Sequence, residues 1–303
     1  AVSVAVVRVV ARKLRSNPDK ELSGIMKSKT ATPVERRLPV TREDFVAIMQ
    51  QDLTAQKHHT KLTVERLAAA LAITDKTEVK ELTELAIVRC ARELAQGKGT
   101  LRDRYDKIVA LYKSQGNLSH RTSMSMLLQQ YSTPAPIGFL MGIFAGLDKL
   151  HQVGGYGFEP SAGNGLLTIA GRPERIYVNE VDEVRNRNLK TQGFANVWNR
   201  DASEAFSYSD IGNTFSAVIT NPPFGTLRKP VFFDTYKIDT LDGLMALKAL
   251  ESMSRDGRAA VIMGGHTRWG KHGRVQGGRN RIFFNYLYNR YYVLDVININ
   301  GRN

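Results

Sequence analysis

Cysteine is almost absent from this sequence, because its 303 residues include a single one, Cys90. No disulfide can therefore form within the chain. Cys90 lies among apolar residues at helical spacing, where a lone cysteine is more often a small core residue than a nucleophile. This usage is typical of proteins that stay in a reducing cytoplasm.

Long hydrophobic runs are also missing. No apolar stretch approaches the roughly 20 residues that a membrane-spanning helix needs. The opening ten residues have no basic region ahead of their apolar run and no convincing cleavage site for a signal peptidase. These absences predict a soluble, cytoplasmic protein with no membrane partner.

Acidic residues are scarce relative to basic ones. The chain has 29 Asp and Glu against 43 Lys and Arg, which gives a net charge of +14. An excess of this size favours polyanionic partners, because phosphate binding releases condensed counterions. The composition therefore favours nucleic acid as a partner, and the alternative is a basic surface that serves solubility alone.

The first 118 residues contain helical patterns but no recognisable chemistry. Residues 1–40 combine an apolar start with basic residues and then Ser, Lys, Thr and Pro, and we interpret them as an N-terminal arm, with a helix or part of a larger protein as alternatives. Residues 41–118 carry apolar residues at helical spacing and are predicted to form a helical domain. The expected helix boundaries are Thr41, Thr63, Leu71, Thr74 or Asp75, and Gly116.

From residue 119 to residue 303 strands and helices alternate, which is typical of a parallel sheet covered by helices. Helices are expected over residues 136–150, 241–253 and 282–288. Six strands are predicted, at residues 155–159, 175–180, 195–201, 215–221, 259–264 and 291–298. The predicted fold is α/β, a doubly wound, Rossmann-like sheet preceded by the all-helical segment, and ligands bind such sheets at the carboxyl ends of the strands.

The loop after the first strand can approach a ligand closely. It runs Glu159-Pro160-Ser161-Ala162-Gly163-Asn164-Gly165, and glycine lets the backbone come near a bound molecule. Thr168 stands where a dinucleotide-binding loop has its third glycine, and the lysine of a phosphate-binding loop is missing. Glu159 disfavours a phosphate and favours a ligand with a cationic or hydrogen-donating group.

Acidic residues also end the next two strands. Glu180 lies about twenty residues after the glycine loop, where a carboxylate suits the two hydroxyls of a ribose. Asp201, followed by Ala202, can accept a hydrogen bond from an adenine amino group. Each acidic residue taken singly is more often a solvated loop residue than a ligand, but three successive acidic strand ends favour one shared site.

The fourth strand ends in Asn221-Pro222-Pro223-Phe224. Proline fixes the backbone and donates no hydrogen bond, so this turn is rigid. It presents the amide of Asn221, the carbonyl of Pro222 and the ring of Phe224, which can hold a planar amine and stack on its ring. In isolation the stretch is an ordinary proline turn, but together with the preceding acidic strand ends it indicates an acceptor site for a planar nitrogen.

These motifs resemble those of S-adenosylmethionine-dependent DNA methyltransferases that modify the N6 amine of adenine, in particular the modification subunits of type I restriction systems. The resemblance covers roughly residues 129–298. Asn221 to Phe224 is similar to the family's catalytic Asn-Pro-Pro-Phe/Tyr motif, and residues 159–165 are similar to its cofactor loop. Residues 130–134, Gln-Tyr-Ser-Thr-Pro, resemble the segment that helps to hold the methionine end of the cofactor.

The resemblance implies S-adenosylmethionine as cofactor, DNA as partner and a target base flipped out of the duplex. The implied catalytic residues are Asn221, Pro222, Pro223 and Phe224. The implied cofactor-binding residues are Tyr131, Thr133, Glu159, Pro160, Gly163, Gly165, Glu180, Asp201 and Ala202. The same catalytic motif serves other planar nitrogens, so RNA, a protein glutamine and cytosine N4 stay open as acceptors, as does a non-catalytic module of a larger assembly.

A glycine-rich basic stretch follows the fifth strand. Its residues can grip a phosphate backbone, and the alternative is a solvated loop. The predicted nucleic-acid-binding residues are Arg268, Trp269, Lys271, Arg274, Arg279 and Arg281. No metal is expected, because His266 and His272 have neither a cysteine nor a carboxylate near them in sequence.

Members of the resembled family continue beyond the sixth strand with an antiparallel hairpin, and they use a target-recognition domain or a separate specificity subunit. We therefore expect the C-terminal end of the fold to be missing here and the sheet edge to be open. Sequence recognition would then depend on a specificity subunit, on additional domains of a longer chain, or on residues 41–116.

Overall fold

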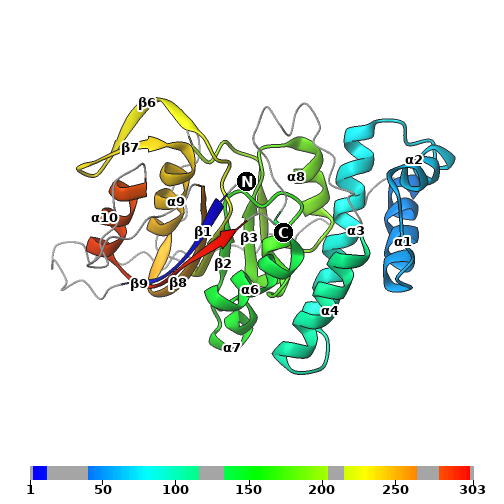
Figure 1. Ribbon diagram of the computed structural model, residues 1–303, viewed down its shortest axis with the longest axis horizontal. Coiled ribbons are helices and arrows are strands. Elements are labelled where there is room, and N and C mark those ends of the chain that lie inside the picture. Colours follow the sequence, from blue (N-terminus) through cyan, green and yellow to red (C-terminus); the bar gives the residue numbers. More distant parts are fainter. Residues whose placement is uncertain (1–2, 12–39, 116–132, 204–214, 265–279, 301–303) are drawn as a thin grey trace.

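The computed structural model describes residues 3–11, 40–115, 133–203, 215–264 and 280–300. Its centre is a seven-stranded, mostly parallel sheet flanked by helices, an α/β arrangement compatible with a Rossmann-like fold (Figure 1). The strand order is β4-β3-β2-β5-β8-β1-β9. The strands are β1 (Ser3–Ala11), β2 (Gly157–Glu159), β3 (Ile176–Asn179), β4 (Asn196–Trp198), β5 (Phe215–Thr220), β8 (Met253–Gly264) and β9 (Tyr291–Asn300).

The six predicted strands are confirmed as β2, β3, β4, β5, β8 and β9. The ends differ most in β8, which begins at Met253 rather than Ala259. Strands β4, β3, β2, β5 and β8 pair in parallel, so their carboxyl ends share one edge of the sheet.

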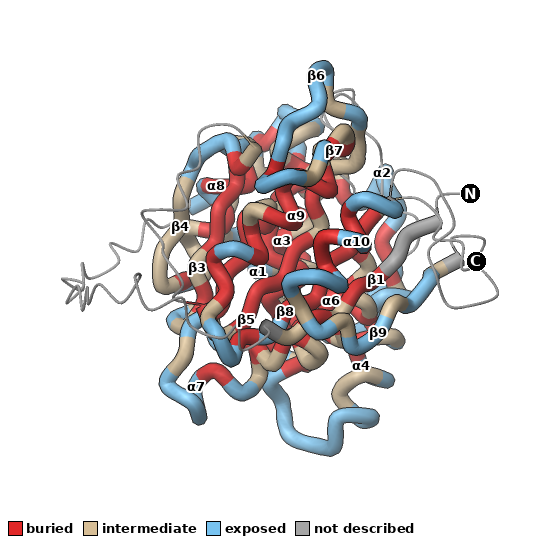
Figure 2. The backbone as a smooth tube through the Cα atoms, turned by 90° about the vertical axis from the view of Figure 1, so that its left-hand side faces the viewer, coloured by how far each residue is buried: buried red, intermediate tan, exposed pale blue. Residues whose placement is uncertain are grey.

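Both faces of the sheet are covered, because successive side chains of a strand point to opposite faces. Val218 of β5 joins a core cluster with helices α9 and α10, whereas its neighbours Ala217 and Ile219 join a cluster with α6, α7 and α8. Figure 2 shows the buried residues concentrated in these strands and helices. The helices are α6 (Ala135–Ala145), α7 (Leu150–Val153), α8 (Glu183–Lys190), α9 (Leu241–Glu251) and α10 (Asn280–Arg290).

Strand β1 corrects one expectation. Residues 3–11 were interpreted as part of an arm, but they form an antiparallel strand between β8 and β9, with Val4 opposite Gly264 and Ser3 opposite Asn300. It lies inside the sheet, and β9 remains the last strand of the described order. The pairing brings together residues that are far apart in the chain, and no short-range sequence pattern reports such a contact.

Four helices follow β1 in the described chain: α1 (Val40–Thr54), α2 (Lys61–Ala70), α3 (Lys76–Gln96) and α4 (Leu101–Ser114). Asp75 caps α3 by accepting from the backbone of Thr77 at 2.9 Å, as predicted. Thr41 does not cap α1, because the helix already includes Val40. The second helix begins at Lys61 rather than Thr63, because Thr60 caps it. Gly116 lies outside the described residues.

These helices do not form a core of their own. Leu82 and Ala86 of α3 share a cluster with Phe139 of α6 and with Leu166 and Ile169, which follow the glycine loop. Because strand β1 comes earlier in the chain, the helices are inserted between two strands of the sheet rather than placed ahead of it. In Figure 1 they lie on the right of the sheet.

A second, two-stranded sheet was not predicted. It consists of β6 (Thr226–Phe233) and β7 (Tyr236–Thr240), which pair antiparallel directly after the proline turn. Pro230 and the charged residues around it hide the alternation that marks a strand. Among the described residues, no helix combines the length and the apolar character that crossing a bilayer requires.

Candidate active site

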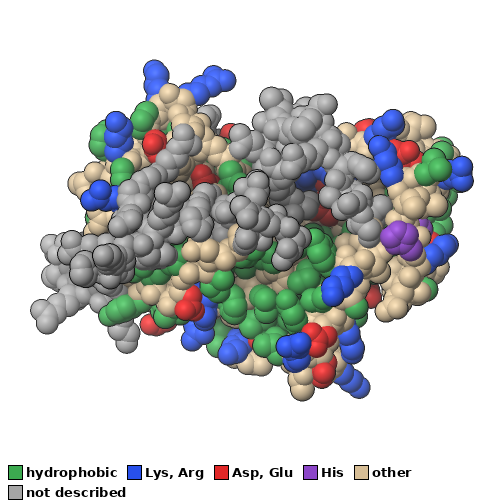
Figure 3. Space-filling view, in the orientation of Figure 1, with side chains coloured by type: hydrophobic (Ala, Val, Ile, Leu, Met, Phe, Trp, Pro, Cys, Tyr) green, Lys and Arg blue, Asp and Glu red, His purple; other side chains and the backbone are tan. Residues whose placement is uncertain are grey.

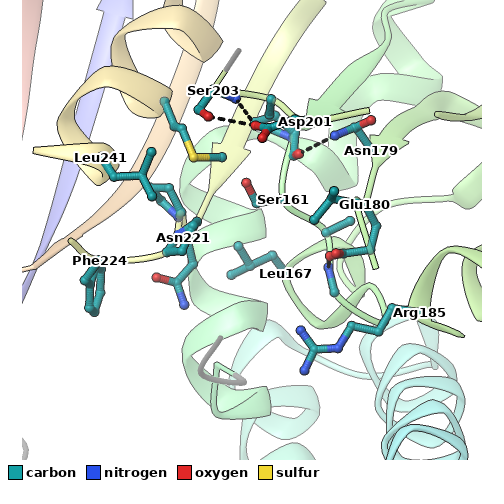
Figure 4. A pocket seen from close by; sticks show the side chains of 18 of the residues that line it. Ser161, Leu167, Asn179, Glu180, Arg185, Asp201, Ser203, Asn221, Phe224 and Leu241 are labelled. Atoms are coloured by element: carbon teal, nitrogen blue, oxygen red, sulfur yellow. Dashed lines mark hydrogen bonds between the residues drawn. The ribbon is translucent and has the colours of Figure 1, made fainter. Parts of the chain in front are cut away.

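A cavity of about 400 Å³ lies where β2, β3, β4 and β5 end (Figure 4). This volume falls in the range of roughly 300–1,000 Å³ that is typical of small-ligand sites. The predicted site residues that line it are Thr133, Pro160, Gly163, Glu180, Asp201, Ala202, Asn221, Pro222, Pro223 and Phe224. Residues from four separate strand ends thus meet at one place, together with Thr133, which precedes α6, and Met245 of α9.

The glycine loop is fixed by the strand ends beside it. Gly163 has φ of +56°, which favours glycine, and its N–H donates to Glu180 Oε2 at 2.8 Å. Gly165 also has a positive φ, +97°, but it does not line the cavity. A Cβ atom there would approach the ring of Phe194 to 3.3 Å. Gly165 therefore serves the turn of the loop, and the structure does not bring it to the cavity surface.

Glu159 lies behind the cavity wall. It is fully buried at the end of β2, and its Oε1 accepts a hydrogen bond from the Ser161 N–H at 2.9 Å. Burial raises the pKa of Glu159 well above its ordinary range, and the bond from Ser161 offsets only part of this effect. The residue predicted to face the ligand is thus an internal support of the loop.

Glu180 faces the cavity with its two oxygens already oriented. Oε1 accepts from the Asp182 N–H at 2.9 Å, and Oε2 accepts from Gly163. Each carboxylate oxygen can accept more than one hydrogen bond, so acceptor capacity remains. Burial raises the pKa of Glu180. The backbone hydrogen bonds and the nearby Arg185 lower it, but they offset only part of the effect of burial.

Asn179, which was not among the predicted site residues, holds three strand ends together. Its Nδ2 donates to the carbonyls of Pro160 at 3.0 Å and Arg200 at 2.9 Å, and its Oδ1 accepts from the Arg200 N–H at 3.0 Å. Beside it, Asp201 Oδ1 accepts from the backbone and hydroxyl of Ser203 at 2.8 and 2.7 Å (Figure 4). These bonds fix the rim of the cavity near Asp201.

Asn221 lies on the opposite side of the cavity in Figure 4. Its Nδ2 donates to Thr133 Oγ1 at 2.9 Å, which joins the proline turn to the start of α6. Its Oδ1 is buried and bonds to no residue that the structure describes. Because a buried acceptor without a partner is costly, this oxygen is ready to accept from a ligand. Phe224 lies next to Gly264, where a Cβ would approach its Cγ to 3.0 Å.

Two charged residues that line the cavity, and that interact with each other electrostatically, were missed. Glu84 of α3 and Arg185 of α8 both line it, and Figure 4 shows the guanidinium of Arg185 on the side of the cavity where Leu167 lies. No local pattern marks Glu84, because it occupies one position of an ordinary amphipathic helix.

Arg185 is held by Glu81 of the same inserted helix. Its Nε donates to Glu81 Oε2 at 2.9 Å and its Nη2 to Oε1 at 3.3 Å, and Asn164 of the glycine loop donates to Oε2 at 2.7 Å. Burial opposes both charges, but each stabilises the other, so the pKa of Glu81 is lowered and that of Arg185 is raised. Helix α3 therefore fixes both the loop and the charged end of the cavity.

Of the predicted nucleic-acid-binding residues, the structure describes Arg281. Arg281 is exposed in the first turn of α10 and does not line the cavity.

Within the described ranges, no group of three or more His, Cys, Asp or Glu side chains is arranged to hold a metal ion. The predicted residues that lie outside the described chain are Tyr131, Arg268, Trp269, Lys271, Arg274 and Arg279.

Comparison of the sequence with models of protein families finds no match, and comparison with curated proteins finds none either. The class of the molecule therefore rests on its own geometry. That geometry is an α/β sheet with a ligand-sized cavity at the carboxyl ends of its parallel strands, lined by hydrogen-bond acceptors and a rigid proline turn.

Proposed function

We propose that this protein is a methyltransferase that moves a methyl group from S-adenosylmethionine to the exocyclic N6 amine of adenine in DNA. The observation that carries the proposal is the buried Oδ1 of Asn221. It lacks a partner among the described residues and belongs to a rigid Asn-Pro-Pro-Phe turn at the cavity.

The lining residues fit the cofactor's hydrogen-bonding groups. Glu180 has remaining acceptor capacity for ribose hydroxyls, and Asp201 can accept from the adenine amino group. Gly163 leaves room for close approach of the ligand. The bound cofactor supplies the electrophilic methyl group, and the protein supplies position.

The amino-acid end of the cofactor is assigned to Glu84 and Arg185. An α-amino acid carries one positive and one negative charge, and this end of the cavity offers one carboxylate and one guanidinium. The bonds from Arg185 to Glu81 hold the guanidinium in one orientation, which reduces the entropy lost on binding.

Asn221 and Phe224 act on the acceptor. The lone pair of an adenine amine is delocalised into its ring, which makes the amine a poor nucleophile. Hydrogen bonds from the amine to Asn221 Oδ1 and the Pro222 carbonyl favour a tetrahedral nitrogen. The lone pair is then available to attack the methyl group that the cofactor would supply. Phe224 stacks on the base, which must leave the duplex to reach the cavity.

DNA is preferred over other acceptors because of charge. The net charge of +14 suits a polyanion and offers nothing specific to a protein glutamine. RNA and cytosine N4 share the chemistry of adenine N6 and are alternatives within the same site. A specificity subunit or further domains would supply recognition of a DNA sequence.

The test is transfer of labelled methyl from S-adenosylmethionine to DNA, RNA and protein assayed side by side. We expect label on N6 of adenine in DNA. Asn221→Ala should lower turnover at least about 100-fold, the scale of removing one preorganised hydrogen-bonding group, while cofactor affinity measured by calorimetry changes only a few fold. Label on protein glutamine alone would contradict the proposal, and a large loss of cofactor affinity would contradict the role of Asn221.

A further inference from the structure

The β6–β7 hairpin has one side fixed to the protein. Phe233 and Ile238 are buried in the cluster that includes α9 and α10. Tyr236 meets Tyr286 edge to face, with ring centroids 5.2 Å apart, and its hydroxyl accepts from Asn289 at 2.8 Å. One side of the hairpin is thus held in place by its packing against α9 and α10.

The other side of the hairpin is basic and exposed. Arg228, Lys229 and Lys237 are exposed, and none forms a salt bridge with a residue that the structure describes. Phe232, which pairs with Lys237, is 70% exposed. Figure 3 shows Lys and Arg side chains at the upper left of the molecule, where Figure 1 places this hairpin.

The hairpin is irregular at two of these basic residues, Arg228 and Lys229. Thr226 pairs with Thr240 and Val231 pairs with Ile238, so residues 227–230 of β6 stand opposite the single residue Asp239 of β7. Bulges of this kind redirect side chains and are frequent beside active sites.

The base of the hairpin belongs to the cavity itself. Thr226 and Leu241 line it, and the Leu241 N–H donates to the Gly225 carbonyl at 3.0 Å. At about 3.3 Å per strand residue, Arg228 and Lys229 lie within roughly 10 Å of the lining residue Thr226. That separation corresponds to a few nucleotide steps of a DNA strand, which rises about 3.4 Å per step.

We infer that the exposed side of the β6–β7 hairpin binds the phosphate backbone of the DNA whose adenine enters the cavity. The inference rests on the proposed function and extends it to a second surface. Arg228, Lys229 and Lys237 neutralise phosphates, and Phe232 makes an apolar contact with a base or sugar.

A second copy of this chain fits the hairpin less well than DNA does. Of the two acidic residues of the hairpin region, Asp234 pairs with Arg290 and Asp239 is only partly exposed. Two copies that met through this basic surface would repel each other, whereas DNA complements it.

The experiment measures binding of the full chain to a labelled 30-base-pair duplex by fluorescence anisotropy at several salt concentrations. The variant is Arg228→Ala, Lys229→Ala and Lys237→Ala together. We expect the slope of log affinity against log salt to fall by about 2 to 3, close to one for each phosphate contact removed. Phe232→Ala should weaken binding about tenfold with the slope unchanged.

The matched control removes the same charges from the opposite end of the molecule in Figure 1: Arg66→Ala in α2 with Lys107→Ala and Lys113→Ala in α4. All three control side chains are exposed. Equal losses in the two triple variants, or an unchanged slope in the hairpin variant, would overturn the inference. Unchanged affinity in Phe232→Ala would overturn its apolar contact, and loss of self-association in that variant would assign the surface to a second copy.

The DNA-binding experiment and the methyl-transfer experiment can fail independently. If DNA is methylated but the hairpin variant binds DNA as the wild type does, the inference fails and the function stands. If the hairpin variant loses DNA affinity while no methyl transfer to DNA occurs, the surface stands and the reaction fails. Loss of RNA binding alone, with DNA binding unchanged, would overturn the assignment to DNA.

Discussion

Glu159 carries an ionisable group into the core at the end of β2. Burial raises its pKa, so the folded chain binds more protons than the unfolded chain between the ordinary glutamate value of about 4.3 and the raised pKa. The stability from this group is fully present below that ordinary value and is lost as pH rises through the raised pKa.

Glu159→Gln should therefore make unfolding less dependent on pH. We expect the variant to gain about 1 to 3 kcal/mol over the wild type at pH 8, because a neutral amide replaces a buried charge and still accepts from Ser161. Urea unfolding followed at pH 6, 7 and 8 measures this. A wild-type and variant pair with the same pH dependence would contradict it.

Glu84 and Arg185 offer a test of how the proposed cofactor would lie in the cavity. Glu84→Gln should weaken binding of S-adenosylhomocysteine about tenfold, since one charge-assisted hydrogen bond is lost. Binding of 5′-methylthioadenosine, which has no amino-acid group, should change less than about twofold. Calorimetry with both ligands measures the difference.

Asp201→Asn is the control for that comparison, because Asp201 is assigned to the adenine that both ligands share. It should weaken both equally. An equal loss for both ligands in Glu84→Gln would show that Glu84 does not face the amino-acid group.

At the scale of single elements, helix α3 is tied to the site by the buried pair of Glu81 and Arg185. Glu81→Gln leaves Arg185 without its charged partner and weakens the anchor of Asn164. We expect a loss of about 3 to 5 kcal/mol in unfolding free energy, as for other broken buried pairs, together with weaker cofactor binding. Glu65→Gln, in an exposed pair on α2, should cost less than about 0.5 kcal/mol.

Urea unfolding and calorimetry on both variants provide the measurements. If Glu81→Gln loses no more stability than Glu65→Gln, the pair does not anchor the loop. If it loses stability but binds cofactor normally, α3 supports the fold without influencing the cavity.

The elements that sequence predicted best are those with strong local patterns. The parallel strands appear as short β-branched runs, and the polar residues at their ends are adjacent to them in sequence, so Glu180, Asp201 and Asn221 could be placed at one edge of the sheet. The β6–β7 hairpin and β1 escaped prediction for different reasons. The hairpin contains a bulge with Pro230, and β1 depends on partners that only the folded chain brings near.

For the molecule as a whole, the part of the site that sequence missed comes from outside the sheet. Glu84 and Glu81 look like any acidic residues of an amphipathic helix, and their roles follow from the packing of α3 against α8 and the glycine loop. Glu159 shows the opposite error. Its position at a strand end suggested a ligand contact, but the loop folds over it and leaves it fully buried.

The position of β1 also has a consequence for biosynthesis. Its partners on β8 and β9 lie some 250 to 300 residues later in the chain, as in the pair Val4 and Gly264. At about 5 to 20 residues per second, the ribosome delivers them tens of seconds after β1 itself. Until then a valine-rich strand must stay unpaired, and closing so long a loop makes its insertion slow. We therefore expect insertion of β1 to be a late step in folding during synthesis.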